Sequence, residues 1–108
     1  MTDIEVRTSG TTISASPSDR IAVRLTQNAS TGYQWSITEI SDGLEVESDE
    51  VLPPGQIAPG AAGERVIIVR PRQTGNARLF LDLKRQWDQK PIDHFEVEVN
   101  VADQELDY

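Results

Sequence analysis

The segment 27–35 holds the side chains of this chain that are best placed to do chemistry. It reads Gln-Asn-Ala-Ser-Thr-Gly-Tyr-Gln-Trp, so two hydroxyls, Ser30 and Thr31, stand directly before Gly32. A serine or threonine acts as a nucleophile only when a general base lies within hydrogen-bond reach. The chain has one histidine, His94, and no G-x-S-x-G elbow. We therefore predict that the chain is not an enzyme and that this segment is a loop shaped for contact with a partner.

The sequence also gives little support for a metal site, a reactive thiol or a bound cofactor. The chain has no cysteine, which removes thiolate nucleophiles, disulfides and thiolate-bound metals. His94 alternates with Phe95 along a strand and is expected to be an exposed surface histidine without the partners that a metal needs. Four acids crowd one short stretch: Glu45, Glu47, Asp49 and Glu50. Their spacing fits no recognised calcium loop, so we interpret them as a solvated face and predict neither a metal nor a cofactor.

Charge and hydropathy exclude further classes of partner. Eighteen acids against ten bases give a net charge of -8, whereas nucleic-acid binding needs a basic face. Solubility explains this charge most simply, and steering toward a cationic partner is the sharper alternative. No apolar run approaches the ~18 residues that span a membrane. The acidic start, residues 1–5, does not resemble a signal peptide, so the chain is either intracellular or has lost a leader, and we leave its location open.

Alternation of apolar and polar residues with a period of two dominates the chain. It predicts strands at 20–26, 33–40, 44–47, 64–70, 76–84 and 92–101, to which 4–6 and 12–14 can be added. No window shows helical spacing of apolar residues. We expect an all-β, immunoglobulin-like antiparallel β-sandwich of about seven to eight strands, with Trp35 in its core. Residues 1–108 are expected to form a single, monomeric domain whose tail, 103–108, frays.

Three of the expected connections should lie at the same end of this sandwich. If each connection reverses the chain, the segments 27–32, 48–63 and 85–91 meet at one end, and the turns 41–43 and 71–75 meet at the other. The first end collects a long stretch rich in proline and glycine together with Arg85 and Trp87. Arginine and tryptophan dominate interface energetics, so we expect Trp87 to be exposed and that end to bind a partner.

Three motifs at that end resemble those of the chagasin family of cysteine peptidase inhibitors. That family carries Asn-Pro-Thr-Thr-Gly-Phe/Tyr, a glycine-rich segment and Arg-Pro-Trp on three loops of an immunoglobulin-like sandwich. The corresponding segments here are Asn-Ala-Ser-Thr-Gly-Tyr at 28–33, Gly-Ala-Ala-Gly at 60–63 and Arg-Gln-Trp at 85–87. Each motif is weak alone, but the three occur in matching order and spacing across nearly the whole chain. The implied peptidase-binding residues are Asn28, Ser30, Thr31, Gly32, Tyr33, Gly60, Ala61, Ala62, Gly63, Arg85 and Trp87.

The resemblance implies a reversible, non-covalent inhibitor of papain-like cysteine peptidases, of the papain or cathepsin L type. Ser30 and Thr31 would lie against the catalytic cysteine and histidine, on a loop whose shape Asn28 and Gly32 fix. The segment 85–87 would brace one side of the cleft and the segment 60–63 the other. Three loops on a rigid scaffold lose little entropy on binding, and an inhibitor needs no catalytic group of its own.

Three residues depart from the family pattern. Ala29 stands where a proline is usual, so the loop 27–32 is less pre-organised, at a typical cost of ~0.4–1 kcal/mol. Gln86 replaces the proline between Arg85 and Trp87, which loosens the presentation of the tryptophan. Ser30 lacks the methyl group of a threonine. These departures keep an alternative open, in which the same end recognises a non-peptidase protein or a glycan. A purely structural immunoglobulin-like domain would show no exposed aromatic side chain at the loop end.

Overall fold

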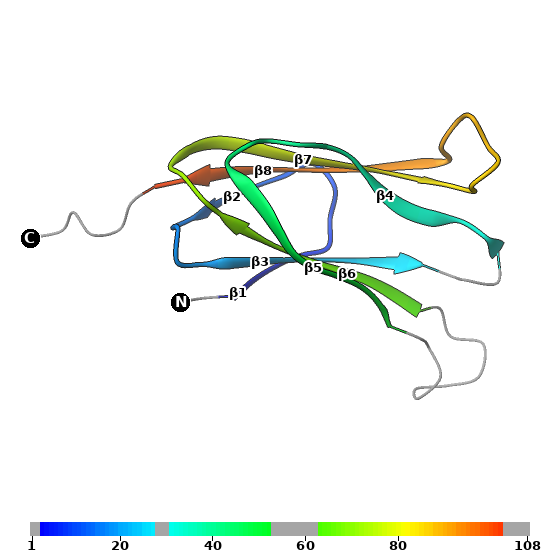
Figure 1. Ribbon diagram of the computed structural model, residues 1–108, viewed down its shortest axis with the longest axis horizontal. Coiled ribbons are helices and arrows are strands. Elements are labelled where there is room, and N and C mark those ends of the chain that lie inside the picture. Colours follow the sequence, from blue (N-terminus) through cyan, green and yellow to red (C-terminus); the bar gives the residue numbers. More distant parts are fainter. Residues whose placement is uncertain (1–2, 28–30, 53–62, 103–108) are drawn as a thin grey trace, which may run out of the picture.

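The computed structural model describes residues 3–27, 31–52 and 63–102, and it confirms an all-β sandwich. The strands are β1 (Asp3–Val6), β2 (Thr11–Ala15), β3 (Arg20–Gln27), β4 (Gln34–Ile40), β5 (Leu44–Leu52), β6 (Gly63–Pro71), β7 (Gly75–Lys84) and β8 (Asp93–Val101). They form two four-stranded sheets, sheet A in the order β1-β3-β6-β5 and sheet B in the order β2-β8-β7-β4 (Figure 1). No helix in this part of the chain is long and apolar enough to cross a membrane.

The sheets are not purely antiparallel, because the two N-terminal strands pair in parallel. In sheet A, β1 runs parallel to β3, with Asp3 opposite Arg20. In sheet B, β2 runs parallel to β8, with Thr11 opposite Val97. The chain therefore passes from the edge of one sheet to the edge of the other through residues 7–10. Gly10 permits this passage because its φ of +83° lies in the left-handed region that side chains disfavour.

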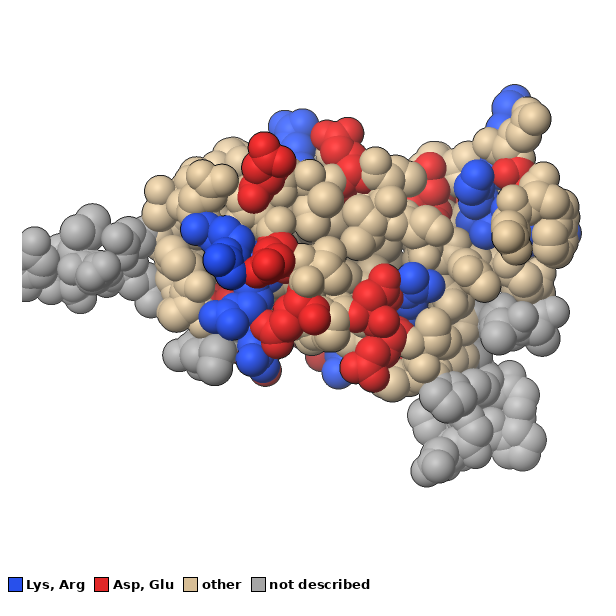
Figure 2. Space-filling view, in the orientation of Figure 1, with Lys and Arg blue, Asp and Glu red and all other residues tan. Residues whose placement is uncertain are grey.

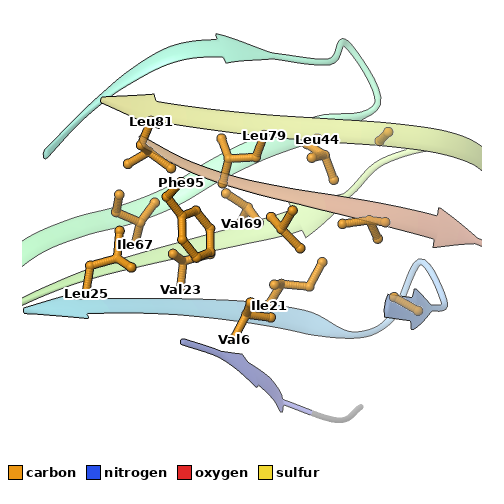
Figure 3. Packing of buried hydrophobic residues seen from close by; sticks show 14 of the residues in the cluster. Val6, Ile21, Val23, Leu25, Leu44, Ile67, Val69, Leu79, Leu81 and Phe95 are labelled. Atoms are coloured by element: carbon orange, nitrogen blue, oxygen red, sulfur yellow. The ribbon is translucent and has the colours of Figure 1, made fainter. Parts of the chain in front are cut away.

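A single apolar core joins the two sheets. Alternate residues of β3, β6, β7 and β8 point inward, as their period-two pattern predicts. The ring of Phe95 lies in the middle of this cluster, between the side chains of sheet A and sheet B (Figure 3). Full burial of a side chain of this size contributes about 1.5–3 kcal/mol. Trp35, at 6% exposure, belongs to the same cluster, which confirms its predicted place in the core.

Strand β5 is longer than predicted, and the connection after it is correspondingly shorter. The alternation predicts a strand that ends at Glu47, but β5 pairs with β6 as far as Leu52. A register shift between Val46 and Ser48 breaks the period of two and hides the second half of the strand. Asp49 there contacts Arg65 of β6 at 2.5 Å, and such a cross-strand pair offsets the poor strand propensity of an acid.

Three of the four acids of β5, Glu45, Glu47 and Asp49, are partly exposed and are paired with arginines, whereas Glu50 is exposed. The ion pairs with β5 are Arg72–Glu45, Arg20–Glu47, Arg70–Glu47 and Arg65–Asp49. Farther across sheet A, Arg24 contacts both Glu5 and Glu64. Basic and acidic side chains accordingly lie next to one another on the visible surface (Figure 2). Within the described ranges, no group of three side chains is arranged to hold a metal ion.

Strand register places three connections at one end, as the sequence predicted. In sheet A, Gln27 pairs with Gly63 and Leu52 pairs with Glu64, so β3 and β5 end where β6 begins. In sheet B, Gln34 pairs with Lys84, so β4 begins where β7 ends, next to the start of β8. Figure 1 shows these strand ends on the same side of the sandwich. The turns 41–43 and 72–74 lie at the opposite end.

Candidate functional site

The loop end, defined as residues 31–33, 63 and 85–92, carries the described part of the predicted site. Thr31, Gly32, Tyr33, Gly63, Arg85 and Trp87 are all placed there. Asn28, Ser30, Gly60, Ala61 and Ala62 lie outside the described residues. Gly63 is not a loop residue as predicted, because it pairs with Gln27 and is the buried first residue of β6.

The turn 31–33 has a shape that depends on glycine. Gly32 has a φ of +81°, which residues with a Cβ adopt only with strain. Beside it, the backbone N–H of Tyr33 donates a hydrogen bond of 3.3 Å to Thr31 Oγ1. A Cβ on Gly32 would lie 3.5 Å from Trp87 Cη2 and 3.7 Å from Arg85 Cγ. The turn 31–33 and the connection 85–92 therefore lie side by side, with room between them for little more than a methyl group.

One guanidinium group links the aromatic side chains of these two segments. Arg85 Cζ lies 4.9 Å from the centroid of the Tyr33 ring and 5.4 Å from that of the Trp87 ring. Both distances are within the ~6 Å over which a cation is attracted to an aromatic face. Trp87 is nevertheless 71% exposed, which confirms its predicted exposure. Most of the Trp87 ring is thus exposed to solvent, while Arg85 restricts its orientation from one side.

Asp88 holds this guanidinium in place and is absent from the predicted site. Arg85 Nε donates to Asp88 Oδ2 at 2.8 Å, and Arg85 Nη2 donates to Asp88 Oδ1 at 3.3 Å. The backbone N–H of Asp88 also donates to the carbonyl of Arg85 at 3.0 Å, which closes a four-residue turn. The hydrogen bond from Arg85 holds the pKa of Asp88 below its ordinary value. The sequence did offer a signal for this pair, because Arg85 and Asp88 lie three residues apart within one short connection.

A buried glutamine, Gln27, joins the two strands that flank the segment 28–33, and it too is absent from the predicted site. Gln27 is 5% exposed, and its Oε1 accepts the backbone N–H of Trp35 at 2.9 Å. Arg65 Nη1 donates to the same oxygen at 3.4 Å. In return, Trp35 Nε1 donates to the carbonyl of Thr26 at 3.0 Å. These bonds tie β3, β4 and β6 together across both sheets, directly below the loop end.

His94 takes no part in this arrangement. Its side chain is 72% exposed, as predicted, and its Nδ1 lies 2.7 Å from Asp82 Oδ1 on the outer side of β7 and β8. The described residues of the loop end thus offer an aromatic surface, hydroxyl and backbone polar groups, and a fixed cation. Such a set suits recognition of a protein surface rather than bond cleavage.

Comparison with solved structures finds the same architecture in several proteins. The cysteine protease inhibitor EhICP2 from Entamoeba histolytica is similar at a TM-score of 0.80 and 25% identity, over 94% of this chain and 97% of that chain. Leishmania mexicana ICP gives a TM-score of 0.65 at 23% identity, over 90% and 91% of the two chains. PbICP-C, solved in complex with falcipain-2, gives a TM-score of 0.61 at 14% identity, over 96% and 100% of the two chains.

Sequence comparison assigns the family. A search of curated proteins gives no significant match. The model of the chagasin family peptidase inhibitors, I42, matches residues 14–99. This range runs from β2 to β8 and includes all three segments that carry the motifs of the resemblance. Because the match covers most of the chain, this protein belongs to the chagasin family of peptidase inhibitors.

Proposed function

We propose that this protein is a reversible, non-covalent inhibitor of papain-like cysteine peptidases and that it covers their catalytic cleft with the loop end. The single observation that carries this proposal is the joining of the turn 31–33 to the exposed Trp87 through Arg85. Family membership makes the chain a peptidase inhibitor rather than an enzyme. Of the solved structures named above, one is a cysteine protease inhibitor and another was solved in complex with falcipain-2.

The chemistry of the chain supports the non-covalent mode. It has no cysteine, so it cannot form a mixed disulfide with a catalytic thiol. Thr31 is exposed but its Oγ1 accepts the N–H of Tyr33, so this hydroxyl shapes the turn. Inhibition then depends on filling the cleft with rigid groups, which keeps the entropic cost of association low. In this arrangement Thr31 enters the cleft next to the catalytic residues, and Arg85 and Trp87 brace one wall.

The test is steady-state inhibition of papain and of a cathepsin L-type peptidase by the wild-type chain and by Trp87→Ala and Thr31→Ala. Truncation of a central tryptophan costs at least about 2 kcal/mol in tight interfaces, so Trp87→Ala should raise Ki about 30-fold or more. Thr74→Ala is the matched control for Thr31→Ala, because Thr74 is an exposed threonine in the turn at the opposite end. It should inhibit like the wild type.

A second measurement separates a non-covalent from a covalent mode. Calorimetric titration of the wild-type chain into a peptidase whose catalytic cysteine is replaced by alanine should still show one-to-one binding. No inhibition of either peptidase by a folded wild-type chain would refute the proposal and favour the non-peptidase partner. Equal inhibition by the wild type and Trp87→Ala would refute the role of the loop end.

A further inference from the structure

The side chain of residue 86 does nothing to stiffen the connection 85–92. Gln86 is exposed, and a glutamine leaves its own φ unrestricted where a proline would fix it. Yet Trp87, its neighbour, lies against Gly32 of another segment although it is 71% exposed. Some other group must therefore hold this part of the connection.

We propose that Asp88 is a positioning residue, which holds Arg85 between the rings of Tyr33 and Trp87 and so presents Trp87 to the peptidase in its binding orientation. This inference rests on the proposed function, since it assigns a task within the same loop end. Asp88 itself need not touch the peptidase.

The contacts of Asp88 fix both its backbone and its carboxylate. Its N–H donates to the carbonyl of Arg85, and its own carbonyl accepts a hydrogen bond of 3.2 Å from Lys84 Nζ. Its side chain is only 20% exposed although it lies in a surface connection. The turn thus fixes the backbone of Asp88, and its half-buried carboxylate is directed at the Arg85 guanidinium. The lowered pKa of Asp88 agrees with an acceptor that is permanently ionised near neutral pH.

The two hydrogen bonds from Arg85 to Asp88 also fix the position of the guanidinium relative to the two aromatic rings. A guanidinium that donates two hydrogen bonds to one carboxylate has its plane fixed, unlike a lysine ammonium. With that plane fixed, Arg85 lies 4.9 Å from the centroid of Tyr33 on one segment and 5.4 Å from that of Trp87 on the other. Without the carboxylate, the guanidinium would be free to leave both rings. Trp87 would then sample several rotamers, and ordering it on binding would lower the affinity.

The first test measures the order of Trp87 without any peptidase. In the full chain, the heteronuclear NOE of each indole Nε1–H reports its motion, and Trp35 serves as a buried internal reference. Asp88→Asn should lower the NOE of Trp87, weaken the proton contact between Trp87 and Gly32, and leave Trp35 unchanged. Arg85→Lys, which keeps the charge but loses the fork, should do the same.

The matched control is Asp93→Asn, because the Asp93 carboxylate accepts a hydrogen bond from the N–H of His94, whereas Arg85 pairs with Asp88. It should leave both indoles as in the wild type. Unchanged order of Trp87 in Asp88→Asn would overturn the proposal, and so would an equal loss of order in Asp93→Asn.

The second test is inhibition of papain. Asp88→Asn should raise Ki about tenfold, the scale of ordering one or two side chains at an interface. In a Trp87→Ala background the same substitution should change Ki little, because its effect acts through Trp87. An equal effect in both backgrounds would overturn the proposal. If the wild type does not inhibit, the proposed function fails, while the NOE measurement still decides whether Asp88 positions Trp87.

Discussion

Replacement of Gln27 by alanine tests how much the hydrogen bond between Gln27 and the backbone of Trp35 contributes to the stability of the fold. Gln27 is 5% exposed and provides the acceptor for the backbone N–H of Trp35. Alanine leaves that buried N–H without an acceptor, at a cost of about 1–3 kcal/mol. It also removes one buried methylene, worth about 0.8 kcal/mol. Arg65 adds little to the loss because it retains two hydrogen bonds to Asp49.

These contributions predict that Gln27→Ala lowers the free energy of unfolding by about 2–4 kcal/mol. Urea denaturation followed by tryptophan fluorescence measures this change, since Trp35 is buried in the folded state. In a thermal melt, each kcal/mol should lower Tm by about 4–8 °C for a chain of this size. The matched control is Gln34→Ala, an exposed glutamine of β4 at the same end, which should change stability by less than about 0.5 kcal/mol.

A loss of less than about 0.5 kcal/mol in Gln27→Ala would refute the reasoning, because it would mean that the Trp35 N–H finds another acceptor. Equal losses in Gln27→Ala and Gln34→Ala would refute it as well. Gln27→Ala should also weaken inhibition at temperatures where the variant is fully folded, because Gln27 and Trp35, which flank the segment 28–33, are then no longer joined by a hydrogen bond.

Three further predictions concern the loop end and the charge of the chain. Gly32→Ala and Gly10→Ala both place a Cβ at positive φ, so each should lose about 1–2 kcal/mol in urea denaturation, but only Gly32→Ala should raise Ki. Equal effects on Ki would contradict this. Because Arg85 lowers the pKa of Asp88, their pairing stabilises the folded state above the ordinary aspartate value of 3.8 and is lost only as the pH falls through the lowered pKa. The ratio of Ki between Asp88→Asn and the wild type should therefore stay constant from about pH 7 to pH 5, and a ratio that falls in this range would contradict the assignment. Finally, the net charge of -8 predicts that salt slows association with a basic peptidase, measured by stopped flow, but hardly affects the dissociation rate. Association that is insensitive to salt would show that charge steering is absent.

The sequence predicted the sandwich and the end at which its loops meet because both follow from regular patterns. Alternation of apolar residues marks the strands that build the core, and reversal of direction at each connection decides which loops are neighbours. The same logic failed at β5, where the register shift between Val46 and Ser48 interrupts the alternation. It also gave no partner for the two N-terminal strands, since parallel pairing depends on contacts between distant parts of the chain.

Within the loop end, the sequence indicated residue types but not their partners. Thr31, Gly32, Arg85 and Trp87 were singled out from motif and composition, and their joint placement agrees with that interpretation. Gln27 was missed because a glutamine at the end of a strand looks like an ordinary polar residue. Its importance arises from burial and from a hydrogen bond to a backbone group eight residues away, neither of which leaves a local signature.

The parallel pairing of β1 with β3 has a practical consequence for handling the molecule. It places Asp3 beside Arg20, and β8 ends at Val101 beside Gly75, so β1 begins and β8 ends on the side of the sandwich away from the loop end (Figure 1). Attachment to a sensor surface through either terminus should thus leave the loops accessible. Two copies joined in tandem by a flexible linker could engage two immobilised peptidase molecules at once, and their retention on the surface would rise through effective concentration alone.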